Sequence, residues 1–262
     1  MKRKEEKRYL EKEWKAMHSH LRSFLNKGKQ ERLHRFRVQV KKLRALLVIT
    51  DSSLEKPTLT PHFKPVRKIF RKAGEIRDAF MNLEMAKAHG LKNAEFLAAQ
   101  HQKLQSAGKV FRKDGKRHLQ GLKKAHLKLK TGIKAIPDIH INLYYQKQLQ
   151  EIATVLAKNT FDDRLHVCRK EIKMLIYTYP LVAKKLDLGF NKAYLEDIQT
   201  AIGDWHDHQV AVSLLTNEGV SKTILNRMIK KNNEQETTIT ALIKDFYNRA
   251  TTMVELPLQQ ID

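Results

Sequence analysis

The chain has 262 residues, of which 41% are hydrophobic, so it can build a core and is not globally disordered. It carries 51 Lys+Arg against 28 Asp+Glu, a net charge of +23, and a single cysteine, which excludes an internal disulfide framework and a cysteine-based zinc site. With no secretory signal and no run of about 18 apolar residues, a cytoplasmic location without a transmembrane segment is expected.

Apolar residues recur at spacings of three and four along nearly the whole chain, and no strand pattern stands out, which predicts an all-α fold. Thr60-Pro61 is typical of a helix start, and Ile136-Pro137-Asp138 is the clearest boundary between helices. A break or kink is expected at Asp114-Gly115. The predicted helices cover residues 4–26, 30–50, 60–88, 93–130, 138–158, 162–186, 191–219 and 221–255.

The surplus positive charge lies in the first half of the chain. Residues 1–131 hold 35 Lys+Arg and 12 Asp+Glu, whereas residues 132–262 hold 16 of each. A field of one sign concentrates its counter-ions, so this asymmetry favours a polyanionic partner.

Two motifs recur in the same order. The segment Leu33 to Lys41 aligns with Leu165 to Lys173 in the frame L-H-x-x-R-x-x-[VI]-K, and Gly74 to Asp78 aligns with Gly203 to Asp207. The offsets are 132 and 129 residues. This internal repeat predicts two copies of one four-helix unit, with repeat one at about 4–131 and repeat two at about 138–256.

The first motif places a basic stripe beside the core. At about 100° per residue, with His34 at zero, Lys41, Arg37 and Arg44 fall at roughly 340°, 300° and 280°. The apolar residues of the same helix fall between about 180° and 260°, so the stripe borders them and is expected to line a cleft between helices. His166, Arg169 and Lys173 repeat the stripe in part, and the second copy is expected to contribute fewer phosphate contacts.

Further basic residues precede the second motif. Arg67, Lys68, Arg71 and Lys72 form two pairs of like charges at i, i+4, which repel mildly and which a bound anion would relieve. A solvated helix face is an equally good interpretation of these four.

The repeated His-x-x-Arg-x-x-x-Lys helix, followed by Gly-x-x-Arg-Asp, resembles the CHAD family, the conserved histidine α-helical domain. The resemblance implies one CHAD domain over 1–262, built as two pseudo-symmetric four-helix bundles around a basic central cavity. It also implies that inorganic polyphosphate is the partner. An association with polyphosphate or storage granules in the cytoplasm is expected. The expected polyphosphate-binding residues are His34, Arg37, Lys41, Lys42, Arg44, Arg67, Lys68, Arg71, Arg77, His166, Arg169 and Lys173, with Asp78 and Asp207 orienting them.

Two alternatives stay open. Nucleic-acid backbones also suit Lys/Arg stripes, although aromatic residues are only 7% of the chain and no stacking platform is evident. The segment Asp204-Trp205-His206-Asp207-His208 could belong to a metal-dependent phosphohydrolase, but the first copy has Arg77 at the position of His206. The preferred prediction is a non-enzymatic binding protein with no cofactor and no metal.

Overall fold

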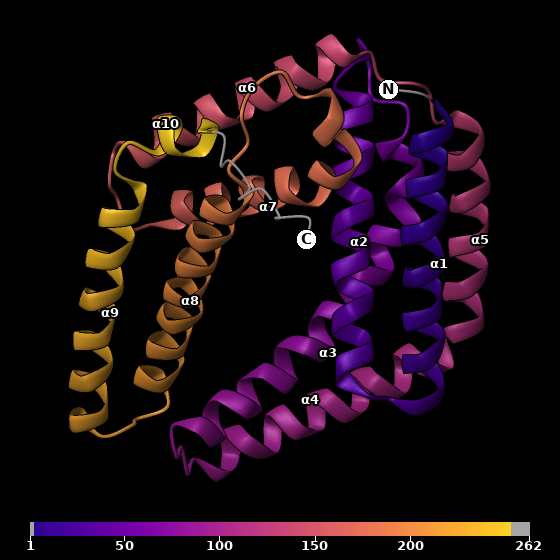
Figure 1. Cartoon of the computed structure of the whole chain (residues 1–262). Helices are drawn as coiled ribbons and strands as arrows, with labels where there is room; N and C mark the ends of the chain where they lie inside the picture. Colours follow the sequence, from indigo (N-terminus) through magenta and orange to yellow (C-terminus); the bar gives the residue numbers. More distant parts are fainter. Residues whose placement is uncertain (1–2, 253–262) are drawn as a thin grey trace, which may run out of the picture. The chain divides into compact units, whose positions relative to one another are not determined.

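The structure, a computed structural model, describes residues 3–252 (Figure 1). Within that range, the regular structure consists of α-helices and short 3-10 helices, with no strand. The predicted all-α fold is therefore confirmed. None of the helices in residues 3–252 is long and apolar enough to cross a membrane.

The chain divides into two compact units. Unit 1 comprises residues up to Pro137 together with Val210–Met228, and unit 2 comprises Asp138–Gln209 together with the residues from Ile229 onward. Residues 210–228, which lie inside predicted repeat two, thus belong to unit 1.

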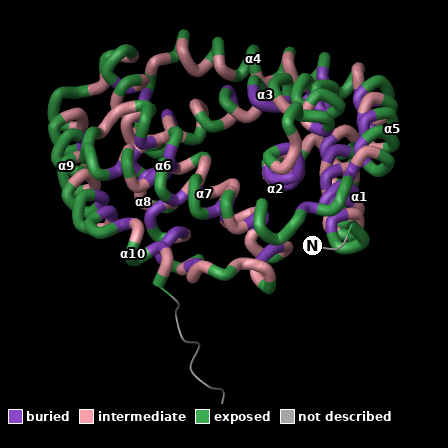
Figure 2. Tube along the Cα trace, turned by 90° about the horizontal axis from the view of Figure 1, so that it is seen from above, coloured by how far each residue is buried: buried purple, intermediate pink, exposed green. Residues whose placement is uncertain are grey.

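Unit 1 is a set of paired helices. Helix α1 packs on α2, α3 packs on α4, and α5 packs against both α1 and α3. Buried and exposed segments alternate along each helix, as amphipathic helices require (Figure 2). The elements of unit 1 are α1 (Arg3–Lys27), α2 (Gln30–Asp51), a 3-10 helix (Thr60–Phe63), α3 (Lys64–Ala88), α4 (Ala94–Lys113) and α5 (Gly115–Gly132).

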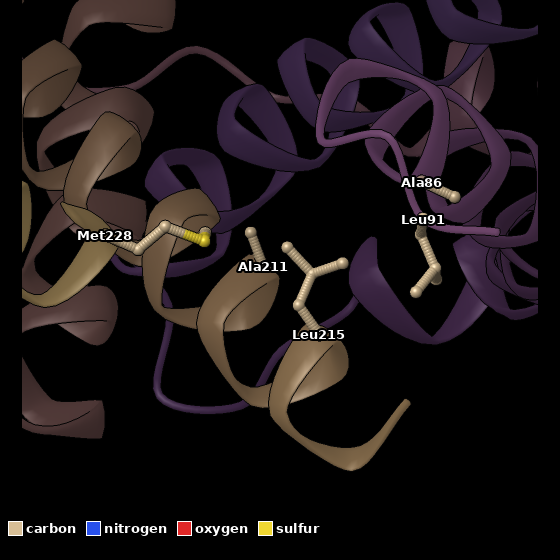
Figure 3. Packing of buried hydrophobic residues seen from close by; sticks show 5 residues of the cluster. All are labelled: Ala86, Leu91, Ala211, Leu215 and Met228. Carbon is tan, nitrogen blue, oxygen red and sulfur yellow. The ribbon is translucent and has the colours of Figure 1, made fainter. Parts of the chain in front are cut away.

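A separate apolar cluster of unit 1 joins residues that are distant in sequence. Ala86 and Leu91, at the end of α3 and just after it, pack with Ala211, Leu215 and Met228 (Figure 3). All five are at least nine-tenths buried. This packing explains why residues 210–228 are part of unit 1.

The connection from α2 to α3 is held by one buried carboxylate. Asp51, 6% exposed at the last residue of α2, accepts hydrogen bonds from the backbone N–H groups of Thr58, Leu59 and Thr60, at 3.0, 2.9 and 2.8 Å. The two helices are therefore tied together at this end by a single side chain.

Unit 2 is built around α6 and α7, with α10 packed on α6. The fully buried Tyr145 of α6 donates its hydroxyl to the backbone oxygen of Leu175, 2.9 Å away, and lies 2.7 Å from the hydroxyl of Thr178, both on α7. The elements are α6 (Asp138–Leu156), α7 (Asp163–Val182), a 3-10 helix (Ala183–Lys185), α8 (Lys192–Asn217), α9 (Lys222–Ile243) and α10 (Phe246–Thr251). The C-terminal end of α8 and the N-terminal end of α9 belong to unit 1.

Three predicted helix boundaries are wrong. The helix predicted to reach residue 186 ends at Val182 and is followed by a 3-10 turn. Thr60-Pro61 opens a 3-10 turn, and α3 begins only at Lys64. The predicted helix over 221–255 is broken after Ile243, because Asp245 adopts a left-handed conformation with φ of 53° before α10. Its last predicted residues, 253–255, lie outside the described range. The predicted helix starts near residues 93 and 162 are confirmed, since the side chains of Asn93 and Asp162 accept the backbone N–H groups of Phe96 and Arg164. The break at Asp114-Gly115 is confirmed too.

Candidate anion-binding site

Helix α2 carries the first basic stripe, and its residues differ in exposure. His34, Lys41 and Arg44 are exposed, whereas Arg37 is partly buried. Lys42, also partly buried, points toward α1, where its Nζ lies 3.6 Å from the carboxylate of the buried Glu13. Lys42 thus joins α1 and α2, and it faces α1 and not the solvent-exposed part of the stripe.

Arg37 reaches across to α3. Its Nη1 donates a hydrogen bond to the backbone oxygen of Phe70 at 2.9 Å, and its Cζ lies 4.2 Å from the centre of the Phe70 ring. Gly74, one turn further along α3, leaves room for the guanidinium, since a Cβ there would lie 2.6 Å from Nη1. Burial lowers the pKa of Arg37, and the charge of Asp78 partly opposes this. The predicted orienting role of Asp78 stays a prediction.

The contact at Arg37 shows how α2 and α3 are oriented. Three residues before Arg37, His34 lies close enough to Arg77 for that charge to add to burial in lowering the pKa of His34. Arg37 of α2 therefore lies next to Gly74 of α3, and His34 of α2 lies next to Arg77 of α3. Residue numbers decrease along α2 as they increase along α3, so the two helices run antiparallel here.

This orientation brings exposed basic residues of both helices to one side of the pair. On α3, measured from Gly74, the rotation about the helix axis is about 20° to Arg67 and about 60° to Arg71. On α2, measured from Arg37, it is about 40° to Lys41 and about 60° to His34, in the same rotational sense. In antiparallel helices, an equal rotation away from a shared contact leads to the same side of the pair. Lys68 lies further round α3, at about 120°, and Arg44 lies about 20° round α2 in the opposite sense. The α2–α3 surface, defined here by His34, Lys41, Arg44, Arg67, Lys68 and Arg71, is exposed throughout.

Four cations of the α2–α3 surface have no carboxylate partner in the part of the chain that the structure describes. Arg44, Arg67, Lys68 and Arg71 form no ion pair with any residue that the structure describes, whereas the neighbouring Lys72 pairs with Asp114 at 2.9 Å. Arg77 is partly buried, and its Cζ lies 5.0 Å from the centre of the Phe80 ring. The surface is therefore a concentration of cations suited to an extended anion.

The second stripe, in unit 2, is more engaged with its own helices. Arg169 donates from Nε to the backbone oxygen of Gln199 on α8, at 3.1 Å, and Lys173 donates from Nζ to the side-chain oxygen of the same glutamine, also at 3.1 Å. Lys173 also lies over the ring of Tyr177, at 5.9 Å from its centre, and burial lowers the pKa of Lys173, with Asp207 acting in the opposite direction. Both cations of this stripe are thus already bound to one residue.

His166, the first residue of the second stripe, lies against another histidine, with the two rings tilted by 31°. The rings of His166 and His206 lie with their centres 3.9 Å apart. Burial, followed by the charge of His206, lowers the pKa of His166 to about 4. At neutral pH, His166 is therefore an uncharged side chain between α7 and α8.

The histidine pair predicts a pH dependence of stability. His166 takes up a proton near pH 6.5 when unfolded but only near pH 4 when folded, so the folded state loses stability as the pH falls from about 6.5 toward 4. We expect His166→Asn to lose less unfolding free energy between pH 7 and pH 5 than the wild type, measured by urea unfolding. His62→Asn, at an exposed histidine, is the control and should behave as the wild type does. An equal loss in the wild type and in His166→Asn would contradict the assignment.

The segment 204–208 does not gather its side chains around one point. Trp205 is buried and donates from its indole nitrogen to Glu236 at 3.2 Å, His206 lies on His166, and Asp204 and Asp207 are exposed. Among residues 3–252, no group of three or more His, Cys, Asp or Glu side chains is arranged to hold a metal ion.

Sequence reasoning missed the residues that engage the predicted cations. Glu13, Phe70 and Gln199 lie on neighbouring helices and belong to neither stripe. One signal was present, because Gly74 and Gly203 occupy the same position in the two copies of the second motif. Both glycines lie inside helices, where glycine is unfavourable unless close approach requires it.

The comparisons with known proteins agree with this architecture. The chain is similar in structure to the CHAD domain from the plant Ricinus communis, with a TM-score of 0.63 and 16% sequence identity over 96% of this chain and 94% of that one. No curated protein matches the sequence. The family model for the CHAD domain matches residues 8–216, most of the chain, and the protein therefore belongs to the CHAD domain family.

Proposed function

We propose that this protein binds inorganic polyphosphate along the α2–α3 surface of unit 1 and does not transform it chemically. The observation that carries the proposal is a set of exposed cations on two packed helices that form no ion pair within residues 3–252, namely Arg44, Arg67, Lys68 and Arg71. Arginine offers a planar fork to phosphate oxygens and lysine a compact charge, so a row of both follows successive phosphates of a chain. Membership of the CHAD family supports this partner, because the sequence resemblance implies it.

Polyphosphate is favoured over nucleic acid by the aromatic residues at the site. Phe70 and Phe80 are partly buried, and each lies beneath a guanidinium, that of Arg37 or Arg77. Stacking of bases needs exposed rings, and these two are covered. The surface therefore offers cations for phosphates and no ring for a base, which fits a partner that presents phosphates alone.

The second stripe is proposed to bind polyphosphate weakly because Gln199 engages Lys173. We expect Gln199→Leu to raise the affinity for polyphosphate by about threefold, since it removes the side-chain acceptor while the backbone acceptor of Arg169 remains. Calorimetric titration of the variant and the wild type measures the change. Unchanged or weaker binding would show that Lys173 does not take part.

The proposed location is a reducing cytoplasm, in association with polyphosphate granules. The single cysteine, Cys168, is buried, and burial raises the pKa of its thiol to about 11, so it is unreactive. No cofactor is required for this function.

The proposal is tested by calorimetric titration of the pure protein with long-chain polyphosphate, duplex DNA and structured RNA, at matched phosphate concentration and physiological salt. We expect polyphosphate to bind far more tightly than either nucleic acid. If about four phosphates are contacted, the logarithm of the affinity should fall against that of the salt concentration with a slope of about −3. Nucleic-acid binding of equal or greater strength would overturn the proposal in favour of a nucleic-acid-binding protein.

A further inference from the structure

The same contact between an arginine and a helical glycine occurs in both units. In unit 1, Arg37 of α2 bonds to the backbone oxygen of Phe70, four residues before Gly74. In unit 2, Arg169 of α7 bonds to the backbone oxygen of Gln199, four residues before Gly203. The acceptor and the glycine therefore have the same spacing in both helix pairs, although the acceptor residue types differ.

Each glycine is needed for the approach of its arginine. A Cβ at Gly74 would lie 2.6 Å from Nη1 of Arg37, and a Cβ at Gly203 would lie 2.6 Å from Nε and 2.8 Å from Cζ of Arg169. Both glycines are buried within helices that are otherwise regular. Glycine weakens a helix interior relative to alanine, so its use at both positions points to a requirement for space.

A guanidinium held in this way is poorly placed to bind phosphate. Arg37 is partly buried and covers the Phe70 ring. It donates to the backbone oxygen of Phe70, which can accept this bond because a carbonyl oxygen has two lone pairs. Lysine could not reproduce this contact, since it lacks the planar fork that both stacks and donates.

We propose that Arg37 and Arg169 are positioning residues that clamp α2 to α3 and α7 to α8, and that they do not serve as phosphate ligands. The Arg37 clamp sets the separation and rotation of the two helices that carry the α2–α3 surface. Its effect on binding rests on the proposed function, whereas the clamp itself does not. Arg44, Arg67, Lys68 and Arg71 then contact the anion.

A double-mutant cycle tests the clamp without any ligand. Alanine favours a helix over glycine, so Gly74→Ala should stabilise the Arg37→Met variant, where the guanidinium is gone. In the wild type it displaces the guanidinium and should bring no stabilisation. Gly121→Ala, in α5, is the control: a Cβ there meets nothing within 4 Å, so it should stabilise both backgrounds equally. Equal stabilisation by Gly74→Ala in both backgrounds would overturn the clamp.

The same cycle with Gly203→Ala and Arg169→Met provides an independent second test, and it replaces the first if a Gly74 variant does not fold. Three atoms of the Arg169 guanidinium lie within 2.8 Å of the added Cβ, so the difference between backgrounds should be larger there.

Binding distinguishes a positioning residue from a ligand. Gly74→Ala changes no charge and pushes the Arg37 guanidinium outward, so it should leave binding unchanged or improve it if Arg37 is a phosphate ligand. A positioning role predicts binding about tenfold weaker, and Arg37→Lys, which keeps the charge, should be weakened to the same extent as Arg37→Met. Unchanged affinity in Gly74→Ala, or full rescue by Arg37→Lys, would overturn the positioning role. Failure of the wild type to bind polyphosphate would refute the proposed function and leave the unfolding cycles as the test of the clamp.

Discussion

Exchanging both Arg67 and Arg71 for glutamate should weaken polyphosphate binding by about 100-fold. Each cation close to a dense anion contributes about 1 kcal/mol, and reversal replaces this attraction with a repulsion about half as large, so two reversals cost about 3 kcal/mol. The two side chains are exposed and form no ion pair with described residues, so the fold should tolerate the change. The exchange replaces one like-charge pair, two arginines at i, i+4, with another, two glutamates at the same positions. The repulsion within the helix therefore stays about the same. Calorimetry at physiological salt measures the loss.

A matched variant separates local contact from net charge. Lys124 and Lys128 of α5 are also exposed and spaced i, i+4, and Lys124→Glu with Lys128→Glu changes the net charge by the same amount. Charges at the surface are screened beyond about 8 Å at physiological salt, so this control should lose less than about tenfold in affinity. If both double variants lose affinity equally, polyphosphate is held by the overall charge of unit 1, and the α2–α3 surface is not the site.

The features predicted well from the sequence are those set by one helix at a time. The period of the apolar residues fixed the helices, and the asparagine at position 93 and the aspartate at 162 mark helix starts because their side chains accept a backbone N–H. The same period placed Lys41 and Arg44 beside the buried face of α2, where both are exposed. Such inferences need only the geometry of a single helix.

The features missed depend on neighbouring helices. Nothing in the stripe shows that Lys42 meets Glu13 or that Lys173 meets Gln199, because those partners are set by packing between elements far apart in sequence. The left-handed backbone of Asp245, after the end of α9, was likewise not predicted. Glycine is the usual residue in this conformation, and an aspartate there gives little indication of it. The predicted two-bundle arrangement and its central basic cavity stay predictions.

The clustering of Ala211 and Leu215 with Ala86 shows the same limit for domain boundaries. Charge and prolines place a boundary near residue 137, where one unit does end, but they contain no information about which residues pack together across the chain. The composition of the last residues of α8 does not indicate which unit they belong to. The assignment depends on the residues that they pack against.

Asp51→Ala should lower the unfolding free energy by about 3–5 kcal/mol, the largest expected effect of a single substitution on stability. The buried carboxylate accepts three backbone hydrogen bonds, and its loss leaves the three N–H groups of residues 58–60 without an acceptor. Asp51→Asn keeps one oxygen but presents an NH₂ group to at least one of these donors, so an intermediate loss is expected. Urea unfolding at neutral pH measures both, and Glu55→Ala, an exposed carboxylate of the same connection, should change stability by less than about 0.5 kcal/mol.

The same substitution links the fold to the site. Asp51 closes the connection between α2 and α3 at one end, and Arg37 joins the same helices further along, so the cations of the α2–α3 surface are placed by two fixed points. In Asp51→Ala protein that is still folded, we expect polyphosphate binding to weaken although no ligand residue has changed. Full affinity in the folded fraction would show that the Arg37 contact alone is enough to set the register of the two helices. A stability loss below about 1 kcal/mol would instead show that water replaces the carboxylate at these three N–H groups.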